Sequence, residues 1–200
     1  MNHLFEPFAL RGITFPNRIA VSPMCQYSAL EGRATDWHLV HYGGLAQGGA
    51  GLVLTEAVAI SSEGRISPQD LGLWDDTQIE PLARVARFIT SQGAMPGVQL
   101  AHAGRKACTP APLRNVPRTT IPLSEGGWMP VAPSALAFDE GWAMPTELDE
   151  SEIARIIHSF TLAAKRALDA GFQVVELHAA HGYLLHQFLS PLTNERTDRY

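Results

Sequence analysis

Short apolar runs alternate with segments of helical periodicity along most of this chain. Four runs are typical of buried β-strands, at residues 18–22, 51–56, 96–101 and 172–178. Apolar side chains at helical spacing predict three helices between these runs, at residues 35–47, 79–89 and 149–168. Glycine follows each predicted helix, at Gly48, Gly93 and Gly171, and glycine readily ends a helix.

Capping residues indicate where two of these helices begin. Thr35 can cap the first helix, and Asp149 with Glu152 has the spacing of a capping box at the start of the third. The apolar face predicted for the third helix comprises Ile153, Ile156, Ile157, Phe160, Ala164, Ala167 and Leu168.

The order of these elements predicts an α/β fold with parallel strands, because crossovers of this length join parallel neighbours. We count about four strand–helix units in a single domain over residues 1–200, whereas a closed TIM (β/α)8 barrel takes about 250 residues. The expected fold is therefore the N-terminal portion of such a barrel without its second half, and an open four-unit sheet is the alternative. Residues 1–17 are expected to form a hairpin that plugs the bottom of the barrel.

Residues 104–147 form a long connection after the third strand and hold seven of the fourteen prolines. A structureless loop of this length is usually functional. Because α/β proteins place their sites at the carboxyl ends of the strands, we expect this loop to cap an active site.

Composition and charge narrow the function. Hydrophobic residues make up 46% and charged residues 18% of the chain, as in globular proteins, and the net charge of -5 provides no basic surface for nucleic acid or membrane. The N-terminus lacks the pattern of a signal peptide, and the uncharged residues 37–55 make a poor membrane span. With Cys25 and Cys108 expected as free thiols, we expect a cytoplasmic protein.

A cluster of polar residues lies where the fourth strand ends. His178 ends the strand, and His181 and Tyr183 follow in the next loop. Two imidazole N–H donors that converge there would bind a carbonyl oxygen or an oxyanion. A tyrosine hydroxyl beside them could protonate a carbon as negative charge moves to that oxygen. These roles suit reduction of a polarised alkene, for which a cofactor must supply the hydride.

The same two histidines are also compatible with a metal site. Catalytic zinc needs a third protein ligand, for which Glu176, Asp36 and His102 are candidates, although none stands at a diagnostic spacing. A metal-dependent barrel hydrolase that uses His178 and His181 therefore remains an alternative.

Other residues are expected at the mouth of the barrel. Cys25 and Tyr27 follow the first strand, and the amide of Gln99 in the third strand suits the edge of a heterocycle. Taken alone, Cys25 is expected to be an inert buried thiol, and Gln99 is equally a core amide. No glycine-rich phosphate loop occurs in the 200 residues, and the usual barrel phosphate site follows strands seven and eight.

Ordered motifs along the chain carry a family resemblance. The most specific are SPMCQY at 22–27, QLAHAGRK at 99–106 and ELHAAHGYL at 176–184. Others lie at residues 4–7, 17–19, 36–38, 63–66, 190–194 and 196–198. Together they resemble the Old Yellow Enzyme family of FMN-dependent ene-reductases. Cys25 with Tyr27, and a second histidine at position 181, resemble its thermophilic-like, xenobiotic-reductase subclass.

The resemblance implies the cofactors and the residues that bind them. FMN would be reduced by NADPH or NADH, and no metal would take part. Pro23, Met24, Cys25 and Ala57 would line the flavin ring, and Gln99 would hydrogen-bond its pyrimidine edge.

The resemblance also implies how an activated alkene would bind. His178 and His181 would hold the carbonyl or nitro oxygen of the small-molecule substrate, and Tyr27 would contact it. Tyr183 would protonate the α-carbon after hydride reaches the β-carbon. The full-length form is expected to be a homo-oligomer.

Some expectations stay open at this point. A non-catalytic truncated fragment unable to hold FMN is a further alternative to the ene-reductase. We expect structural roles for the side chains that share the first helix, namely His38, His41 and Tyr42. For His102, Arg105 and Lys106, a structural role and a role in shaping the site are equally open.

Overall fold

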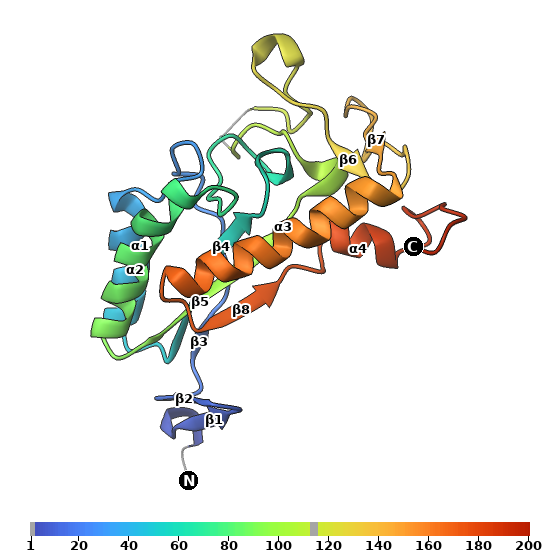
Figure 1. Cartoon of the computed structure of the whole chain (residues 1–200). Helices are drawn as coiled ribbons and strands as arrows, with labels where there is room; N and C mark the ends of the chain where they lie inside the picture. Colours follow the sequence, from blue (N-terminus) through green and yellow to red (C-terminus); the bar gives the residue numbers. More distant parts are fainter. Residues whose placement is uncertain (1–2, 113–115) are drawn as a thin grey trace.

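A four-stranded parallel sheet forms the centre of the molecule (Figure 1). The structure is a computed structural model that describes residues 3–112 and 116–200. The strands lie side by side in the order β3 (Ala20–Val21), β4 (Leu52–Ala59), β5 (Met95–Ala101) and β8 (Val174–Leu177). They are joined by helices α1 (Asp36–Gln47), α2 (Ile79–Ser91) and α3 (Glu150–Asp169). Each strand and helix that the sequence predicts is present, although β3 and β8 are shorter and β4 is longer than predicted.

The strand order distinguishes a barrel segment from an open doubly wound sheet. Each new strand is added at the same edge, so the spatial order equals the chain order, and every neighbouring pair is parallel. A doubly wound sheet would instead reverse its order at a switch point. Helix α1 packs against α2, and α2 against α3, as in the outer layer of a barrel. This topology confirms the predicted parallel α/β fold and is that of the first half of a (β/α)8 barrel.

Apolar side chains hold the helices on the sheet. One core joins α2, α3 and the sheet through Leu82, Ile156 and Phe172, and another lies beneath α1 and includes Tyr42 and Ile89. All five are at most 4% exposed. Full burial of a large apolar side chain stabilises a fold by about 1.5–3 kcal/mol relative to exposure.

The helices begin where the capping residues predict. At α3 the Glu152 amide donates to Oδ1 of Asp149 at 2.7 Å, and the Asp149 amide donates to Oε2 of Glu152 at 2.9 Å. This reciprocal pair is the predicted capping box. At α1 the Thr35 amide donates to Nδ1 of His38 at 2.9 Å, so a histidine takes the place of the usual acidic partner.

The predicted N-terminal hairpin is present. Strands β1 (Phe8–Leu10) and β2 (Ile13–Phe15) pair antiparallel and lie below the amino ends of the sheet (Figure 1). Their apolar side chains share a groove of about 390 Å³ with Leu52 and Val174. The hairpin thus lies where a barrel plug would be, and the plugging role itself stays a prediction.

Short elements interrupt the long connection of residues 104–147. It contains 3-10 turns at Gly104–Lys106 and Leu123–Glu125, and a parallel pair formed by β6 (Val131–Ala132) and β7 (Thr146–Glu147). The expectation of a structureless loop is therefore wrong. Strands of two residues among prolines are too short to produce a periodic signal in the sequence.

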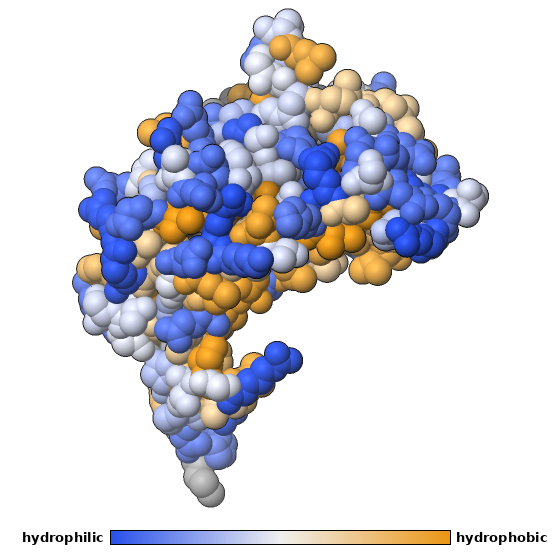
Figure 2. All heavy atoms as spheres, in the orientation of Figure 1, coloured by the Kyte–Doolittle hydropathy of each residue, from blue (hydrophilic) through white to orange (hydrophobic). Residues whose placement is uncertain are grey.

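An apolar surface extends from α3 over β8 to the short helix α4 (Leu184–Leu189). Ile157 and Leu168, which belong to the predicted apolar face of α3, are 55% and 63% exposed. Figure 2 shows apolar side chains gathered beneath α3 and toward α4. The apolar face of α3 is therefore wider than the part of it that α2 and the sheet cover. Periodicity in the sequence predicts which side chains share a face, but not which of them a neighbouring element buries.

None of the helices within residues 3–112 and 116–200 is long and apolar enough to cross a membrane.

Replacing Asp149 by alanine tests the start of α3. The variant loses the acceptor of the Glu152 amide, and loss of such a cap destabilises a protein by about 1 kcal/mol. We expect the urea midpoint to fall accordingly with an unchanged m-value. The exposed change Lys165→Ala on the same helix is the control, with an expected effect below about 0.5 kcal/mol. Equal effects of the two changes would contradict the capping box.

Candidate active site

A cavity of about 440 Å³ opens at the carboxyl ends of the sheet strands. Its volume lies within the range of small-molecule sites. The residues that line it come from four separate parts of the chain: Ser22, Pro23, Cys25, Ala57, Gln99, Glu176, Leu177, His178, Ala179, Ala180, His181 and Tyr183. The structure therefore brings together most of the residues selected from the sequence. Met24 and Tyr27 lie outside this lining, and Met24 is 50% exposed.

A tight turn after β8 places His181 and Tyr183. The Tyr183 amide donates to the Ala180 carbonyl at 3.1 Å, and the central residues His181 and Gly182 have φ of 56° and 72°. Positive φ at both positions is the pattern of a type I′ turn, which suits glycine but strains histidine by about 1–3 kcal/mol. The surroundings enforce this conformation, because Nζ of Lys106 donates to the His181 carbonyl at 2.9 Å.

The two histidines contact each other. Nδ1 of His178 accepts from the Ala180 amide at 3.3 Å, which assigns the proton of a neutral imidazole to Nε2. That Nε2 lies 3.4 Å from Nδ1 of His181. Burial, and then the His181 charge, lower the pKa of His178, so the ring is neutral at pH 7. The Nε2–H of His178 therefore faces Nδ1 of His181, and convergence of both N–H groups on one substrate oxygen stays a prediction.

Tyr183 packs edge to face on His178, with ring centroids 4.7 Å apart. Nζ of Lys106 lies 5.2 Å from the centroid of the Tyr183 ring. Burial raises the pKa of Tyr183 to about 12, and the charges of Cys25 and Asp70 add to this shift. The phenol therefore keeps its proton at neutral pH and can donate it.

Three strands contribute side chains at one level of the cavity. Ala57 of β4 pairs in register with Gln99 of β5, which pairs with Glu176 of β8. Nε2 of Gln99 donates to Oε1 of Glu176 at 2.5 Å. Within the described parts of the chain, the amide oxygen of Gln99 has no hydrogen-bond partner. This wall therefore offers an acceptor beside a small side chain.

Cys25 and Tyr27 are neighbours in the loop after β3. The neighbouring Ala57 amide and Tyr27 side chain lower the pKa of the Cys25 thiol, but burial outweighs them. Burial, followed by the charges of Asp70 and Glu56, raises the pKa of Cys25 to about 12. Burial also raises the pKa of Tyr27. Both groups are therefore protonated at neutral pH, and Cys25 is not a thiolate nucleophile.

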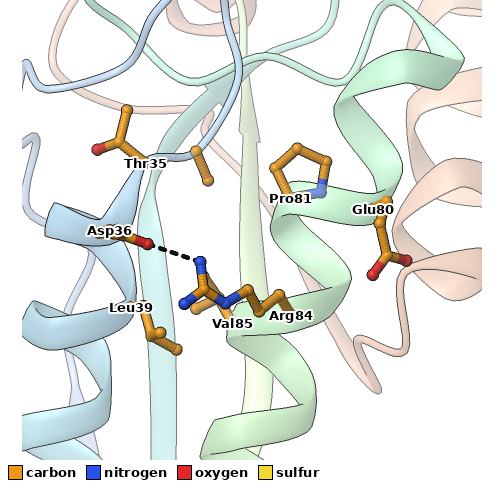
Figure 3. A pocket seen from close by; sticks show the side chains of 8 residues that line it. Thr35, Asp36, Leu39, Glu80, Pro81, Arg84 and Val85 are labelled. Carbon is orange, nitrogen blue, oxygen red and sulfur yellow. Dashed lines mark hydrogen bonds and ion pairs between the residues drawn. The ribbon is translucent and has the colours of Figure 1, made fainter.

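The candidate third metal ligands make other contacts. Asp36 pairs with Arg84 at 2.6 Å in a groove of about 250 Å³ between α1 and α2 (Figure 3). His102 is fully buried, with Nδ1 accepting from the Gly104 amide at 3.0 Å, and Glu176 accepts from Gln99. Among the residues that the structure describes, no three His, Cys, Asp or Glu side chains are grouped to hold a metal ion.

The residues that begin the long connection divide into two groups. Lys106 belongs to the site through its contacts with His181 and Tyr183. Arg105 instead holds the connection together, because its Nη1 donates to the carbonyls of Leu136 and Ala137 at 3.2 and 3.1 Å. His102 is likewise part of the fold.

Two buried carboxylates next to the site were not predicted from the sequence. Asp70 is 2% exposed and accepts from the Ile66 amide and the Ser67 hydroxyl, both at 2.7 Å. Burial raises its pKa to about 6. Glu56 is fully buried within β4. The sequence signal that could have identified them is a single carboxylate within an apolar segment. Burying such a group destabilises the fold unless the carboxylate is hydrogen-bonded.

Comparisons with known proteins agree with this geometry. The profile of the NADH:flavin oxidoreductase / NADH oxidase family matches residues 3–200. The chain is 52% identical over 200 residues to an NADH:flavin oxidoreductase from Gibberella zeae, covering 98% of this chain and 48% of that protein. It is 48% identical over 202 residues to the NADPH dehydrogenase of Listeria welshimeri, covering 100% of this chain and 55% of that protein.

A solved structure of a related protein has the same fold over nearly the whole of this chain. The Old Yellow Enzyme from Pichia sp. AKU4542 matches with a TM-score of 0.85 at 29% identity, covering 99% of this chain and 51% of that chain. The chain thus spans about half the length of the relatives that it matches.

The raised pKa of Cys25 predicts how the alkylation rate of its thiol changes with pH. Since the pKa is about 12, the thiolate fraction and the alkylation rate should rise about tenfold per pH unit from pH 7.5 to 9.5. Iodoacetamide labelling of the Cys25 peptide, followed by mass spectrometry, measures this rate. Free cysteine treated in parallel should begin to level off near its ordinary pKa of about 8.5. A plateau at that pH for Cys25 as well would contradict the buried thiol.

Proposed function

This chain belongs to the NADH:flavin oxidoreductase / NADH oxidase family, and we propose that its cavity serves FMN-dependent reduction of activated C=C bonds. The substrates would be α,β-unsaturated carbonyl or nitro compounds, with NADPH or NADH as the reductant. The observation that carries this proposal is that the protonated Tyr183 contacts His178, which in turn contacts His181, in one cavity. The thermophilic-like, xenobiotic-reductase subclass remains part of the proposal through Cys25, Tyr27 and His181.

The cavity wall fits a flavin ring. Pro23, Cys25 and Ala57 line it with small or apolar groups, and the amide oxygen of Gln99, which has no partner among the described residues, is an acceptor suited to a ring N–H. Met24 is the exception, because its side chain does not line the cavity. When bound, FMN would supply the hydride that no side chain can provide.

His178 and His181 would bind the substrate oxygen. Nε2–H of His178 now has Nδ1 of His181 as its acceptor, and a carbonyl or nitro oxygen would replace that nitrogen. The exposed His181 could then turn its own N–H to the same oxygen. Both rings would stabilise negative charge there as N–H donors.

Tyr183 would protonate the substrate carbon. The phenol is a weak acid in this site, and it gains driving force as negative charge develops on the substrate. Lys106, with Nζ near the face of the ring, would stabilise the phenolate that forms. Tyr27 would contact the substrate from beside Cys25.

A metal-dependent hydrolase is the less favoured function. It would need a third ligand beside His178 and His181, and two of the three candidates lie in other contacts away from the cavity. Stoichiometric zinc in colourless protein, with hydrolysis that a chelator abolishes, would establish that function instead.

Titration with FMN tests the proposed cofactor. We expect saturable binding that quenches flavin fluorescence, and Gln99→Leu should weaken it by about three- to tenfold through the loss of one hydrogen bond. Gln173→Leu, an exposed change at the opposite end of the sheet, is the matched control and should leave affinity unchanged. Absence of binding would support the alternative of a non-catalytic fragment unable to hold FMN.

Replacing Tyr183 by phenylalanine tests the proton donor. With flavin bound, reoxidation by cyclohexenone should slow by about 100-fold, since general acid catalysis contributes at least that much. Reduction by NADPH should change by less than about twofold, because it requires no proton from Tyr183. Stopped-flow absorbance measures both half-reactions, and Tyr200→Phe is the control. An equal loss in both half-reactions would refute the assignment.

A further inference from the structure

A buried polar cluster beneath α1 has no part in the proposed chemistry. Glu56 of β4 and His38 of α1 are fully buried, and Tyr42 of α1 is 1% exposed. A carboxylate in such a place is strongly destabilised unless hydrogen bonds replace its hydration. The contacts of Glu56 are therefore central to how this region folds.

A bulge in β4 directs Glu56 away from the cavity. The register pairs Leu54 with Gly97 and then Ala57 with Gln99, so β4 holds one more residue than β5 between these pairs. Ala57 lines the cavity, whereas Glu56 does not and lies against α1 instead.

Two groups of α1 face Oε1 of Glu56. The Tyr42 hydroxyl donates to it at 3.0 Å, and the same hydroxyl accepts from the Glu56 amide at 2.9 Å. Nε2 of His38 lies 3.2 Å from Oε1, although the two atoms are not aligned as a hydrogen bond. Because Nδ1 of His38 accepts from the Thr35 amide, a neutral His38 carries its proton on Nε2.

The other oxygen of Glu56 binds the loop after β3. The Gln26 amide donates to Oε2 at 2.9 Å, and the Ser28 hydroxyl donates to the Gln26 carbonyl at 2.9 Å. Gln26 stands between Cys25 and Tyr27, and Tyr27 has φ of 51°. A bulky residue adopts this left-handed conformation only where its surroundings enforce it. Gln26, the residue before Tyr27, is thus held through both its amide and its carbonyl.

We infer that Glu56 is a positioning residue, which holds Cys25 and Tyr27 at the cavity by anchoring the Gln26 amide to α1. Glu56 does not line the cavity, and its hydrogen bonds join the loop to α1 without reaching either histidine of the pair. Its effect on substrate binding rests on the proposed function, whereas the anchoring itself does not.

The change Glu56→Gln should release this loop. A glutamine has one acceptor oxygen and one NH2 group in place of two acceptors. Two proton-bearing groups, Tyr42 and His38, face the Oε1 position, and only the Gln26 amide faces Oε2. The oxygen should therefore occupy the Oε1 position, which leaves the NH2 group opposite the Gln26 amide.

Amide hydrogen exchange of the unmodified chain gives the first test. The Gln26 amide should be protected at least about 100-fold relative to an unstructured peptide, as expected of a buried hydrogen bond. The adjacent Tyr27 amide, which has no acceptor in the described part of the chain, should exchange at least about tenfold faster. Equal exchange of these two amides overturns the inference.

Variants separate anchoring from charge and from stability. In Glu56→Gln we expect Gln26 exchange to rise at least about tenfold and Cys25 alkylation at least about threefold. Glu56→Asp keeps the charge, but its side chain is too short to reach both the Gln26 amide and the Tyr42 hydroxyl. Gln26 exchange and Cys25 alkylation should therefore rise in this variant as well. The control Ile89→Val, in the core beside Tyr42, lowers stability without touching Glu56 and should leave both rates unchanged. Unaltered rates in Glu56→Asp would show that charge alone matters and would overturn the inference.

The flavin-loaded protein then tests the consequence for the site. In Glu56→Gln the KM for cyclohexenone should rise at least about threefold, while the rate of flavin reduction by NADPH stays within about twofold. If the protein does not bind FMN, the proposed function fails, and the exchange results still decide the role of Glu56. Increased Gln26 exchange without a change in KM would overturn the positioning role in substrate binding.

Discussion

The parallel pairing of β3, β4, β5 and β8 is the constraint on which the rest of the structure depends. Parallel neighbours cannot be joined by a tight turn, so each connection must cross the sheet, and here α1, α2 and α3 make these crossings. All four carboxyl ends consequently meet at one end of the sheet. This is why Cys25, Gln99 and His178, which are far apart in the chain, line a single cavity.

Burial then determines the chemical character of that cavity. Removal from water disfavours charge, and it raises the pKa of Cys25 and Tyr183 while it lowers the pKa of His178. The site is therefore rich in neutral proton donors at physiological pH. Such groups suit a reaction in which negative charge develops on the substrate and is then neutralised by a proton.

The position of the site depends equally on groups outside it. The carboxylate of Glu56 joins α1 to the loop that carries Cys25, and Nζ of Lys106 holds the carbonyl of His181. Both contacts support a residue in the left-handed conformation, Tyr27 in one case and His181 in the other. Strain at these two positions is thus offset by hydrogen bonds from the surrounding fold.

Local patterns in the sequence predicted the four sheet strands, the three helices that join them and most of the named residues that line the cavity. Asp149 and Glu152 specify a helix start through hydrogen bonds between near neighbours, and the cluster from His178 to Tyr183 lies within one turn, so both are readable locally. Only the tertiary structure decided three other features: the hydrogen bond between the histidines, the exposure of Ile157, and the role of Glu56. The reason is physical, since burial, ring orientation and hydrogen-bond partners depend on contacts between elements distant in sequence, which periodicity and spacing do not encode.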